Sequence, residues 1–136
     1  MLRRVAVTAK GDILIIDDDP DFCEIARVTL ESASFSVRCA SSSAQGLELM
    51  RREKPDLVFL DVIMVLPDEG VYVSEVMARD PELSDVPVVM VSSIADSDLA
   101  GFFPTDRPLH VHRFLDKPVQ LQTLIEVANE FVKAPD

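Results

Sequence analysis

The chain has 136 residues and a formal net charge of −11, and 48% of its residues are apolar. This length is typical of one domain that buries a core without staples, and the apolar fraction argues against a disordered chain. The negative charge argues against direct binding of nucleic acid, and no apolar run reaches the roughly 20 residues of a membrane-spanning helix.

Apolar runs with strand character alternate with runs of helical periodicity along the chain. The predicted strands cover 13–17, 36–40, 57–61, 87–92 and 110–115, and the predicted helices cover 20–33, 43–54, 69–79 and 119–133. Strands that alternate with helices of this length indicate a parallel sheet with right-handed crossovers. Prolines interrupt the stretch between 93 and 110, so we expect an irregular fourth helix near 96–103 followed by a loop.

The composition of the strands predicts their order. The strands at 13–17, 57–61 and 87–92 are almost wholly apolar, as expected when both faces of a strand are covered. The strands at 36–40 and 110–115 carry polar and charged residues, which indicates edge positions. The prediction is an α/β, flavodoxin-like, doubly wound sheet of five parallel strands in the order 2-1-3-4-5. We expect this domain to occupy 12–134, after an N-terminal extension of 1–11.

Two predicted helices begin with capping signals. Asp19 precedes Pro20, which is an N-cap followed by proline at the first helical position. Ser42 and Gln45 resemble a capping box. The apolar stripe of the first helix is predicted to consist of Phe22, Ile25, Ala26, Leu30 and Ala33, and that of the last helix of Leu121, Leu124, Ile125, Ala128, Phe131 and Val132.

The cysteines and histidines do not form a metal-binding pattern. Cys23 falls in a predicted helix and Cys39 in a predicted strand, and both are interpreted as small core residues of a cytoplasmic protein without a disulfide. His110 and His112 alternate along the last predicted strand and are interpreted as surface residues.

Chemically active side chains follow four of the predicted strands. Asp17 and Asp18 end the first strand, Asp61 the third and Ser92 the fourth, and Lys117 follows the fifth. The carboxyl ends of parallel strands line one crevice, so these groups should converge there. Carboxylates suit Mg²⁺, Asp61 is a candidate nucleophile toward phosphorus, and Lys117 and Ser92 could balance charge on phosphoryl oxygens.

The motifs at these strand ends resemble those of response-regulator receiver domains of two-component signalling. The matching stretches are ILIIDDDP (13–20), DLVFLDVIM (56–64), PVVMVSS (87–93) and FLDKPV (114–119). The resemblance implies that a histidine kinase or a histidine phosphotransfer protein phosphorylates the chain. The residue roles implied are Asp61 as phosphoacceptor; Asp17, Asp18, Asp61 and the backbone carbonyl of Ile63 as ligands of Mg²⁺ or Mn²⁺; Lys117 as partner of the phosphoryl group; and Ser92 and Phe114 as switch residues.

The resemblance also carries expectations about output. The Lys117–Pro118 peptide bond is expected to be cis. Phosphorylation is expected to switch protein–protein interactions with an output protein that the sequence does not identify, and a homodimer is left open. The chain is expected to be a stand-alone receiver, and the alternative is a fragment of a larger protein. It is not expected to be an enzyme.

Three departures from the family pattern stand out. The loop at 65–70 has Val65 at a position where proline is usual and one extra residue before Gly70. The segment at 93–110 is longer than usual and contains a Phe102-Phe103 pair, and Phe114 lacks the hydroxyl of a tyrosine. Apolar Ile63 and Ile94 are expected to flank the attacking water without orienting it, which predicts slow self-dephosphorylation.

Two other functions are weighed against this one. A degenerate receiver could act as a phosphorylation-independent binding module, which the altered loops favour and the complete acidic site does not. A haloacid-dehalogenase-like phosphatase would use Asp17 as nucleophile and Asp19 as acid/base. Pro20 is unusual for that class, and the phosphatase reading leaves Asp61 without a role.

Overall fold

The computed structural model describes residues 9–61, 69–92 and 110–132, and these form a sheet with helices on both faces. The strands are β1 (Asp12–Ile16), β2 (Ser36–Ala40), β3 (Leu57–Asp61), β4 (Val88–Ser92) and β5 (Arg113–Asp116), and the helices are α1 (Pro20–Ser32), α2 (Ser43–Arg52), α3 (Glu69–Arg79) and α5 (Leu121–Phe131). All strand pairs are parallel, in the order β2-β1-β3-β4-β5. The predicted α/β fold and strand order are confirmed, while the irregular fourth helix falls outside the described residues.

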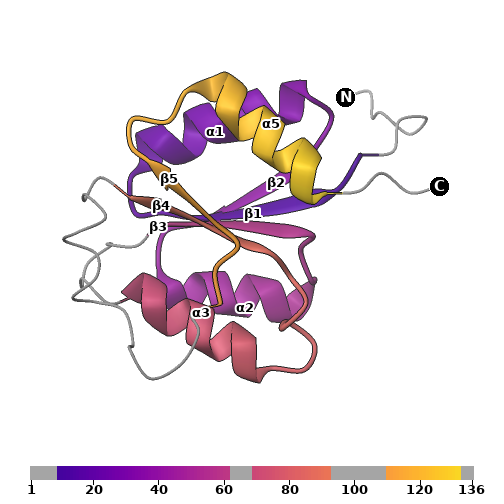
Figure 1. Ribbon diagram of the computed structural model, residues 1–136, viewed down its shortest axis with the longest axis vertical. Coiled ribbons are helices and arrows are strands. Elements are labelled where there is room, and N and C mark those ends of the chain that lie inside the picture. Colours follow the sequence, from indigo (N-terminus) through magenta and orange to yellow (C-terminus); the bar gives the residue numbers. More distant parts are fainter. Residues whose placement is uncertain (1–8, 62–68, 93–109, 133–136) are drawn as a thin grey trace.

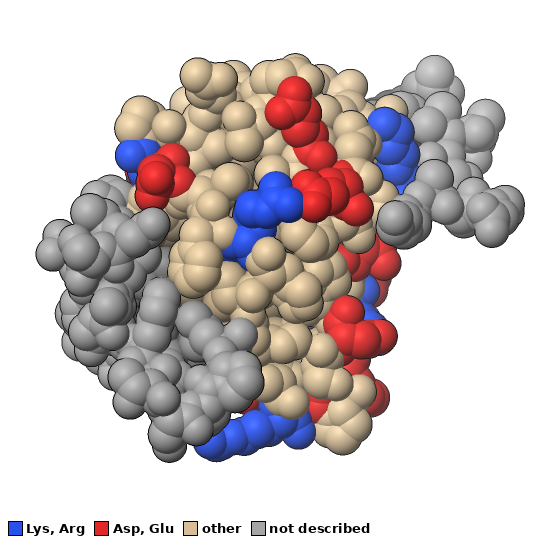
Figure 2. Space-filling view, in the orientation of Figure 1, with Lys and Arg blue, Asp and Glu red and all other residues tan. Residues whose placement is uncertain are grey.

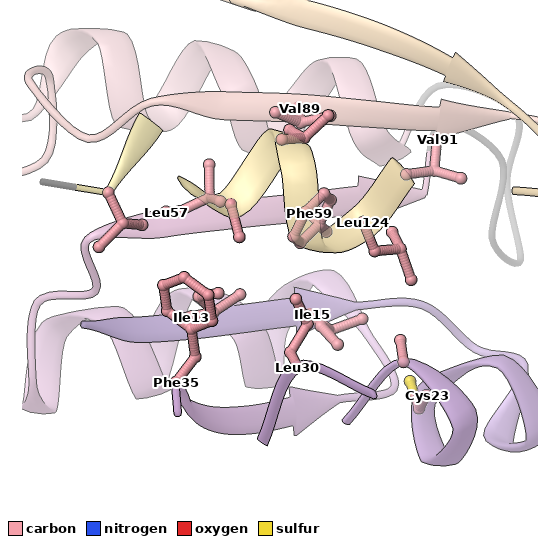
Figure 3. Packing of buried hydrophobic residues seen from close by; sticks show 14 residues of the cluster. Ile13, Ile15, Cys23, Leu30, Phe35, Leu57, Phe59, Val89, Val91 and Leu124 are labelled. Carbon is pink, nitrogen blue, oxygen red and sulfur yellow. The ribbon is translucent and has the colours of Figure 1, made fainter. Parts of the chain in front are cut away.

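The helices cover the two faces of the sheet in pairs. Helices α1 and α5 lie on one face, and α2 and α3 lie on the other (Figure 1). Every residue of β3 and β4 is buried, as expected for central strands covered on both sides. Figure 3 shows the core between the sheet and the α1–α5 layer, where alternate residues of β1 and β3, such as Ile13, Ile15 and Phe59, pack among side chains that include Leu30 and Leu124.

The predicted helix starts are present. Asp19 Oδ1 accepts the backbone N–H groups of Asp21 at 3.0 Å and Phe22 at 3.4 Å, so Asp19 caps α1. Ser42 Oγ accepts the N–H of Gln45 at 3.1 Å. The Gln45 side chain accepts the N–H of Ser41 at 2.8 Å, one residue before the position that a regular capping box would use.

A glycine allows α2 to pack closely against β1. A Cβ atom on Gly46 would lie 2.4 Å from Cδ1 of Ile16, which is the last residue of β1. A side chain at Gly46 would therefore force the Ile16 side chain to move. Ile16 directly precedes Asp17 in the chain, so this close packing lies next to the acidic residues.

Two predicted helix faces need correction. Ile25 is 52% exposed and Leu121 is 47% exposed, although both were placed on apolar stripes facing the core. Cys23 and Val127 are buried instead. Helical periodicity locates the centre of an apolar stripe, but the neighbouring helix decides how far the covered face extends.

The predicted last strand begins too early. Strand β5 starts at Arg113 rather than at His110. The backbone N–H of Val88 donates to Nδ1 of the His112 ring at 3.1 Å, and the N–H of His112 donates to the Val88 carbonyl at 2.7 Å. A side chain thus takes the place of a backbone acceptor, and the regular ladder starts one residue later. His112 is exposed as predicted, whereas His110 is only partly exposed.

Candidate functional site

Three carboxylates meet at the carboxyl end of the sheet. Asp17 follows β1 directly and Asp61 is the last residue of β3. The two strands are neighbours in parallel register, so both residues leave the sheet at the same edge, where β1 leads into α1 (Figure 1). Oxygen atoms of Asp17, Asp18 and Asp61 all lie within 4.8 Å of one another. The structure therefore brings these three predicted residues together.

Asp17 is the most firmly held of the three carboxylates. Its side chain is 1% exposed. Oδ1 accepts the N–H of Asp19 at 2.9 Å, and Oδ2 accepts a hydrogen bond from Lys117 Nζ at 2.9 Å. Its own N–H donates to the carbonyl of Ala40 at 3.0 Å. Backbone and side chain are thus both anchored, as a preorganised ligand requires.

Asp18 and Asp61 differ in exposure. Asp61 is 6% exposed, whereas Asp18 is exposed to solvent. Asp17 and Asp61 thus form the buried side of the site, and Asp18 forms the side that is open to solvent.

Lys117 supplies the positive charge at this site. Its Nζ lies 2.9 Å from Asp17 Oδ2 and 4.0 Å from Asp61 Oδ2. Burial opposes its charge, but the hydrogen bond to Asp17 and the charge of Asp61 outweigh that effect and raise the pKa of Lys117 above its usual value. The ammonium group therefore stays protonated at neutral pH.

Backbone and ring contacts orient Lys117. Its N–H donates to the Ser92 carbonyl at 2.7 Å, which ties it to the end of β4. Its Nζ also lies 4.8 Å from the centre of the Phe22 ring, within the range of a cation–π contact. The Lys117–Pro118 peptide bond is cis, as predicted.

The two predicted switch residues have different surroundings. Ser92 is 3% exposed and ends β4, the strand beside that of Asp61. Phe114 is 42% exposed and lies opposite Met90 in the β4–β5 register. Ile63, the predicted backbone ligand, lies outside the described residues, as do Ile94, the Phe102-Phe103 pair, and the loop at 65–68.

The donor set fits a divalent cation bound by oxygen. Lys117 lies near two of the three carboxylates, those of Asp17 and Asp61. The three carboxylates and one ammonium group have a formal net charge of minus two. Buried like charges are unfavourable unless a cation balances them. Carboxylate oxygens are the ligands that Mg²⁺ and Mn²⁺ prefer, and among the described residues no cysteine or histidine belongs to this cluster.

The sequence missed one contact of this site. The Cys23 thiol donates to the backbone carbonyl of Asp17 at 3.3 Å. Cys23 lies one helical turn after the Asp19 cap, where the start of α1 turns back toward the end of β1. The sequence indicates only that Cys23 lies on the buried side of the first turn of α1. That position is equally consistent with an ordinary core residue.

The chain resembles known proteins over almost its whole length. A family model described as "Response regulator receiver domain" matches residues 13–129. RpaA of Synechocystis sp., described as a "DNA-binding dual master transcriptional regulator", is 35% identical over 126 residues, which are 91% of this chain and 50% of RpaA. Protein PilH of Pseudomonas aeruginosa is 30% identical over 118 residues, which are 86% of this chain and 93% of PilH. The chain therefore spans about half of RpaA and nearly all of PilH.

Solved structures share the fold. The chemotaxis response regulator CheY4 of Vibrio cholerae superposes with a TM-score of 0.79, covering 91% of this chain and 99% of CheY4 at 18% identity. A sensor protein from Polaromonas sp. JS666 gives a TM-score of 0.77 at 28% identity, covering 90% of this chain and 96% of that protein.

Proposed function

This chain belongs to the response regulator receiver domain family, and from that premise we propose that it is a switch controlled by phosphorylation of Asp61. The observation that carries the proposal is the placement of Asp61 at the end of β3, beside Asp17, Asp18 and Lys117. A nucleophile at this position has charged side chains beside it, and the site is open to solvent at Asp18.

The reaction is a phosphoryl transfer to a carboxylate. An oxygen of Asp61 attacks the phosphorus of a phosphohistidine, the new P–O bond forms as the P–N bond breaks, and the imidazole leaves with a proton from solvent. A Mg²⁺ or Mn²⁺ ion held by Asp17, Asp18 and Asp61 would supply charge balance for the phosphoryl oxygens when bound. Lys117, only 4.0 Å from Asp61, is placed to donate to a phosphoryl oxygen.

The switch involves the ends of β4 and β5. The Ser92 hydroxyl would donate to a phosphoryl oxygen on Asp61 and so draw its loop toward the site. Phe114, still 42% exposed in this state, would then bury its ring. Phosphorylation would bias a pre-existing equilibrium between these arrangements, by the difference in contacts that the phosphoryl group makes in each.

The phosphodonor is a histidine kinase or a histidine phosphotransfer protein. An apolar groove of about 630 Å³ between α1 and the start of α5 adjoins Lys117 and includes Phe22 and the exposed side chains of Ile25 and Leu121. Exposed apolar side chains beside a reactive site suit a protein partner. We place the approach of the phosphodonor on this side.

The output is a protein–protein interaction in the cytoplasm, with a homodimer as one form it could take. The net charge of −11 disfavours direct contact of this chain with nucleic acid. On the face shown in Figure 2, the acidic and basic groups of the described residues are scattered, with uncharged surface between them, and these residues form no basic stripe. Among the described residues no helix is long and apolar enough to cross a membrane.

The phosphatase alternative fits the geometry less well. Its acid/base residue would be Asp19, but Asp19 Oδ1 already accepts two backbone N–H groups as the cap of α1. Its nucleophile would be Asp17, whose two oxygens are occupied by the Asp19 N–H and Lys117. Asp61 would again have no role.

The test is intact mass after incubation with Mg²⁺ and acetyl phosphate. We expect one phosphoryl adduct on the wild type, no adduct without Mg²⁺, and none on Asp61→Asn. Asp116→Asn is the matched control, because it changes an exposed carboxylate at the same sheet edge and should leave the adduct unchanged. An adduct of equal yield on Asp61→Asn would contradict the proposal.

The lifetime of the adduct tests a second part of the proposal. We propose that the chain is not a phosphatase and removes its own phosphoryl group slowly, because Ile63 and Ile94 cannot hydrogen-bond to an attacking water. The adduct should persist for many minutes after the donor is removed, and Ile94→Asn should shorten its life. Loss within seconds in the wild type would contradict this part.

A further inference from the structure

Two thiols lie together between α1 and β2, next to the acidic site. Cys39 Sγ donates to the backbone carbonyl of Cys23 at 3.7 Å, and both residues line the same surface pocket. Both cysteines are free. Because α1 and β2 pack against each other, the Cys39 thiol already lies against the backbone of Cys23, and we expect rotation of the two side chains to bring the sulfur atoms together.

A small oxidant can reach this pair from solvent. Both cysteines line a surface pocket of about 430 Å³ that also includes Asp17, Asp18 and Arg27. Cys39 is partly exposed, whereas Cys23 is buried. The accessible thiol would therefore react first, and the buried thiol lies beside it to complete the reaction.

We propose that Cys23 and Cys39 form a site of reversible oxidation to a disulfide. Hydrogen peroxide oxidises the Cys39 thiol to a sulfenic acid and releases one water. The Cys23 sulfur then attacks the Cys39 sulfur, the S–S bond forms as the S–O bond breaks, and a second water leaves. Two electrons pass from the two thiols to one peroxide, and a dithiol such as dithiothreitol returns them by exchange.

The oxidation is coupled to the acidic site through Cys23. Its S–H group donates to the backbone carbonyl of Asp17 at 3.3 Å, and a disulfide has no hydrogen to donate. Asp17 would lose one of the bonds that fix its position, and the first turn of α1 would be drawn toward β2. We expect the affinity for a divalent cation to fall about tenfold, as for other losses of support behind a metal ligand. This second step rests on the proposed function, whereas the oxidation itself does not.

The oxidation is tested by intact mass of the full chain after brief treatment with hydrogen peroxide. The wild type should lose two hydrogens, remain monomeric, and recover them with dithiothreitol. In Cys23→Ser the sulfenic acid on Cys39 should persist and be captured by dimedone, while Cys39→Ser should give little capture. Circular dichroism checks that both variants are folded. Failure of the wild type to lose two hydrogens, or loss only in a covalent dimer, would overturn the proposal.

The coupling is tested by binding of Mn²⁺ to the reduced and oxidised protein, followed by electron paramagnetic resonance. Oxidation should weaken Mn²⁺ binding in the wild type, and peroxide should have no such effect on Cys39→Ser. Equal affinities of the reduced and disulfide forms would overturn the coupling. Failure of the reduced protein to bind Mn²⁺ would instead contradict the proposed metal site, so the two failures can be told apart.

Discussion

The two ends of the sheet differ in how their carboxylates are balanced by positive charge. At the amino end, Arg38 contacts one carboxylate, Asp12, at 2.7 Å and donates to two backbone carbonyls at the end of α2. At the carboxyl end, three carboxylates cluster around one ammonium group, that of Lys117, which contacts Asp17 and Asp61. At the amino end Arg38 and Asp12 are paired one to one, with Glu53 and Asp56 as further acidic neighbours of Asp12. The carboxyl-end cluster has two more carboxylates than ammonium groups. That difference indicates that stability shaped the first end and ligand binding the second.

The largest expected effect comes from removing the cation at the carboxyl end. In Lys117→Gln the 1% exposed carboxylate of Asp17 loses its counter-charge, so the free energy of unfolding should fall by about 3 kcal/mol without metal. Mg²⁺ should restore part of that loss, because it supplies positive charge to the same carboxylates. Urea unfolding with and without Mg²⁺ measures both values.

The matched control for that variant is Lys54→Gln. In the Lys54–Asp85 ion pair the lysine side chain is 49% exposed and the aspartate side chain 70% exposed, and such pairs contribute little to stability. An equal fall in the free energy of unfolding in the two lysine variants would show that Lys117 is no more important for stability than an exposed lysine. It would contradict the argument that the buried carboxylates need its charge.

A smaller loss is expected at the amino end. Arg38→Leu removes the ion pair with Asp12 and the bonds to the carbonyls of Leu49 and Glu53, which should cost about 2 kcal/mol. Mg²⁺ should restore none of it. The control is Arg52→Leu, whose ion pair with Glu48 is largely exposed, and which should change stability by less than about 0.5 kcal/mol. If Mg²⁺ restored the free energy of unfolding of Arg38→Leu, the proposed difference between the two ends of the sheet would be wrong.

Binding of metal should itself stabilise the wild type. At a Mg²⁺ concentration about ten times Kd, the unfolding free energy should rise by about 1.4 kcal/mol. Asp18→Asn should abolish most of that gain, whereas Asp21→Asn, an exposed carboxylate of the first turn of α1, should keep it. Thermal unfolding across a Mg²⁺ titration measures the effect, and equal gains in both variants would argue for nonspecific screening.

The smallest effect concerns pH at the amino end. His112 is exposed as a residue, but partial burial of its ring and the nearby His110 lower its pKa below the ordinary 6.5. The neutral ring is therefore favoured in the fold, where its Nδ1 accepts the N–H of Val88. This contribution is complete above pH 6.5 and is lost as the pH falls toward the depressed pKa. The free energy of unfolding, measured at a series of pH values, should decline with falling pH in the wild type. The decline should be weaker in His112→Gln.

Much of the architecture follows from the sequence. The wholly apolar runs identify the central strands, and the polar content of the other two identifies the edges. The convergence of Asp17, Asp61 and Lys117 follows from parallel topology, because each residue ends or follows a strand. The spacing of motifs then predicts a site that no single aspartate could indicate.

The remaining errors come from tertiary contacts that a local pattern does not contain. Ile25 and Leu121 lie on apolar stripes but border an open groove, since the covering of a stripe depends on the neighbouring helix. Strand β5 starts late because the His112 ring takes the place of a backbone acceptor. The contact of the Cys39 thiol with the Cys23 carbonyl depends on how α1 packs on β2, and the spacing of the two cysteines does not indicate it.

The most direct test is to locate the phosphoryl group on the chain. The protein is treated with Mg²⁺ and acetyl phosphate, the acyl phosphate is reduced with borohydride to homoserine, and the peptides are sequenced by mass spectrometry. If Asp61 is the phosphoacceptor, homoserine should occur at position 61 and at no other aspartate. Homoserine at position 17, with Asp61 intact, would contradict the proposed function and favour the phosphatase.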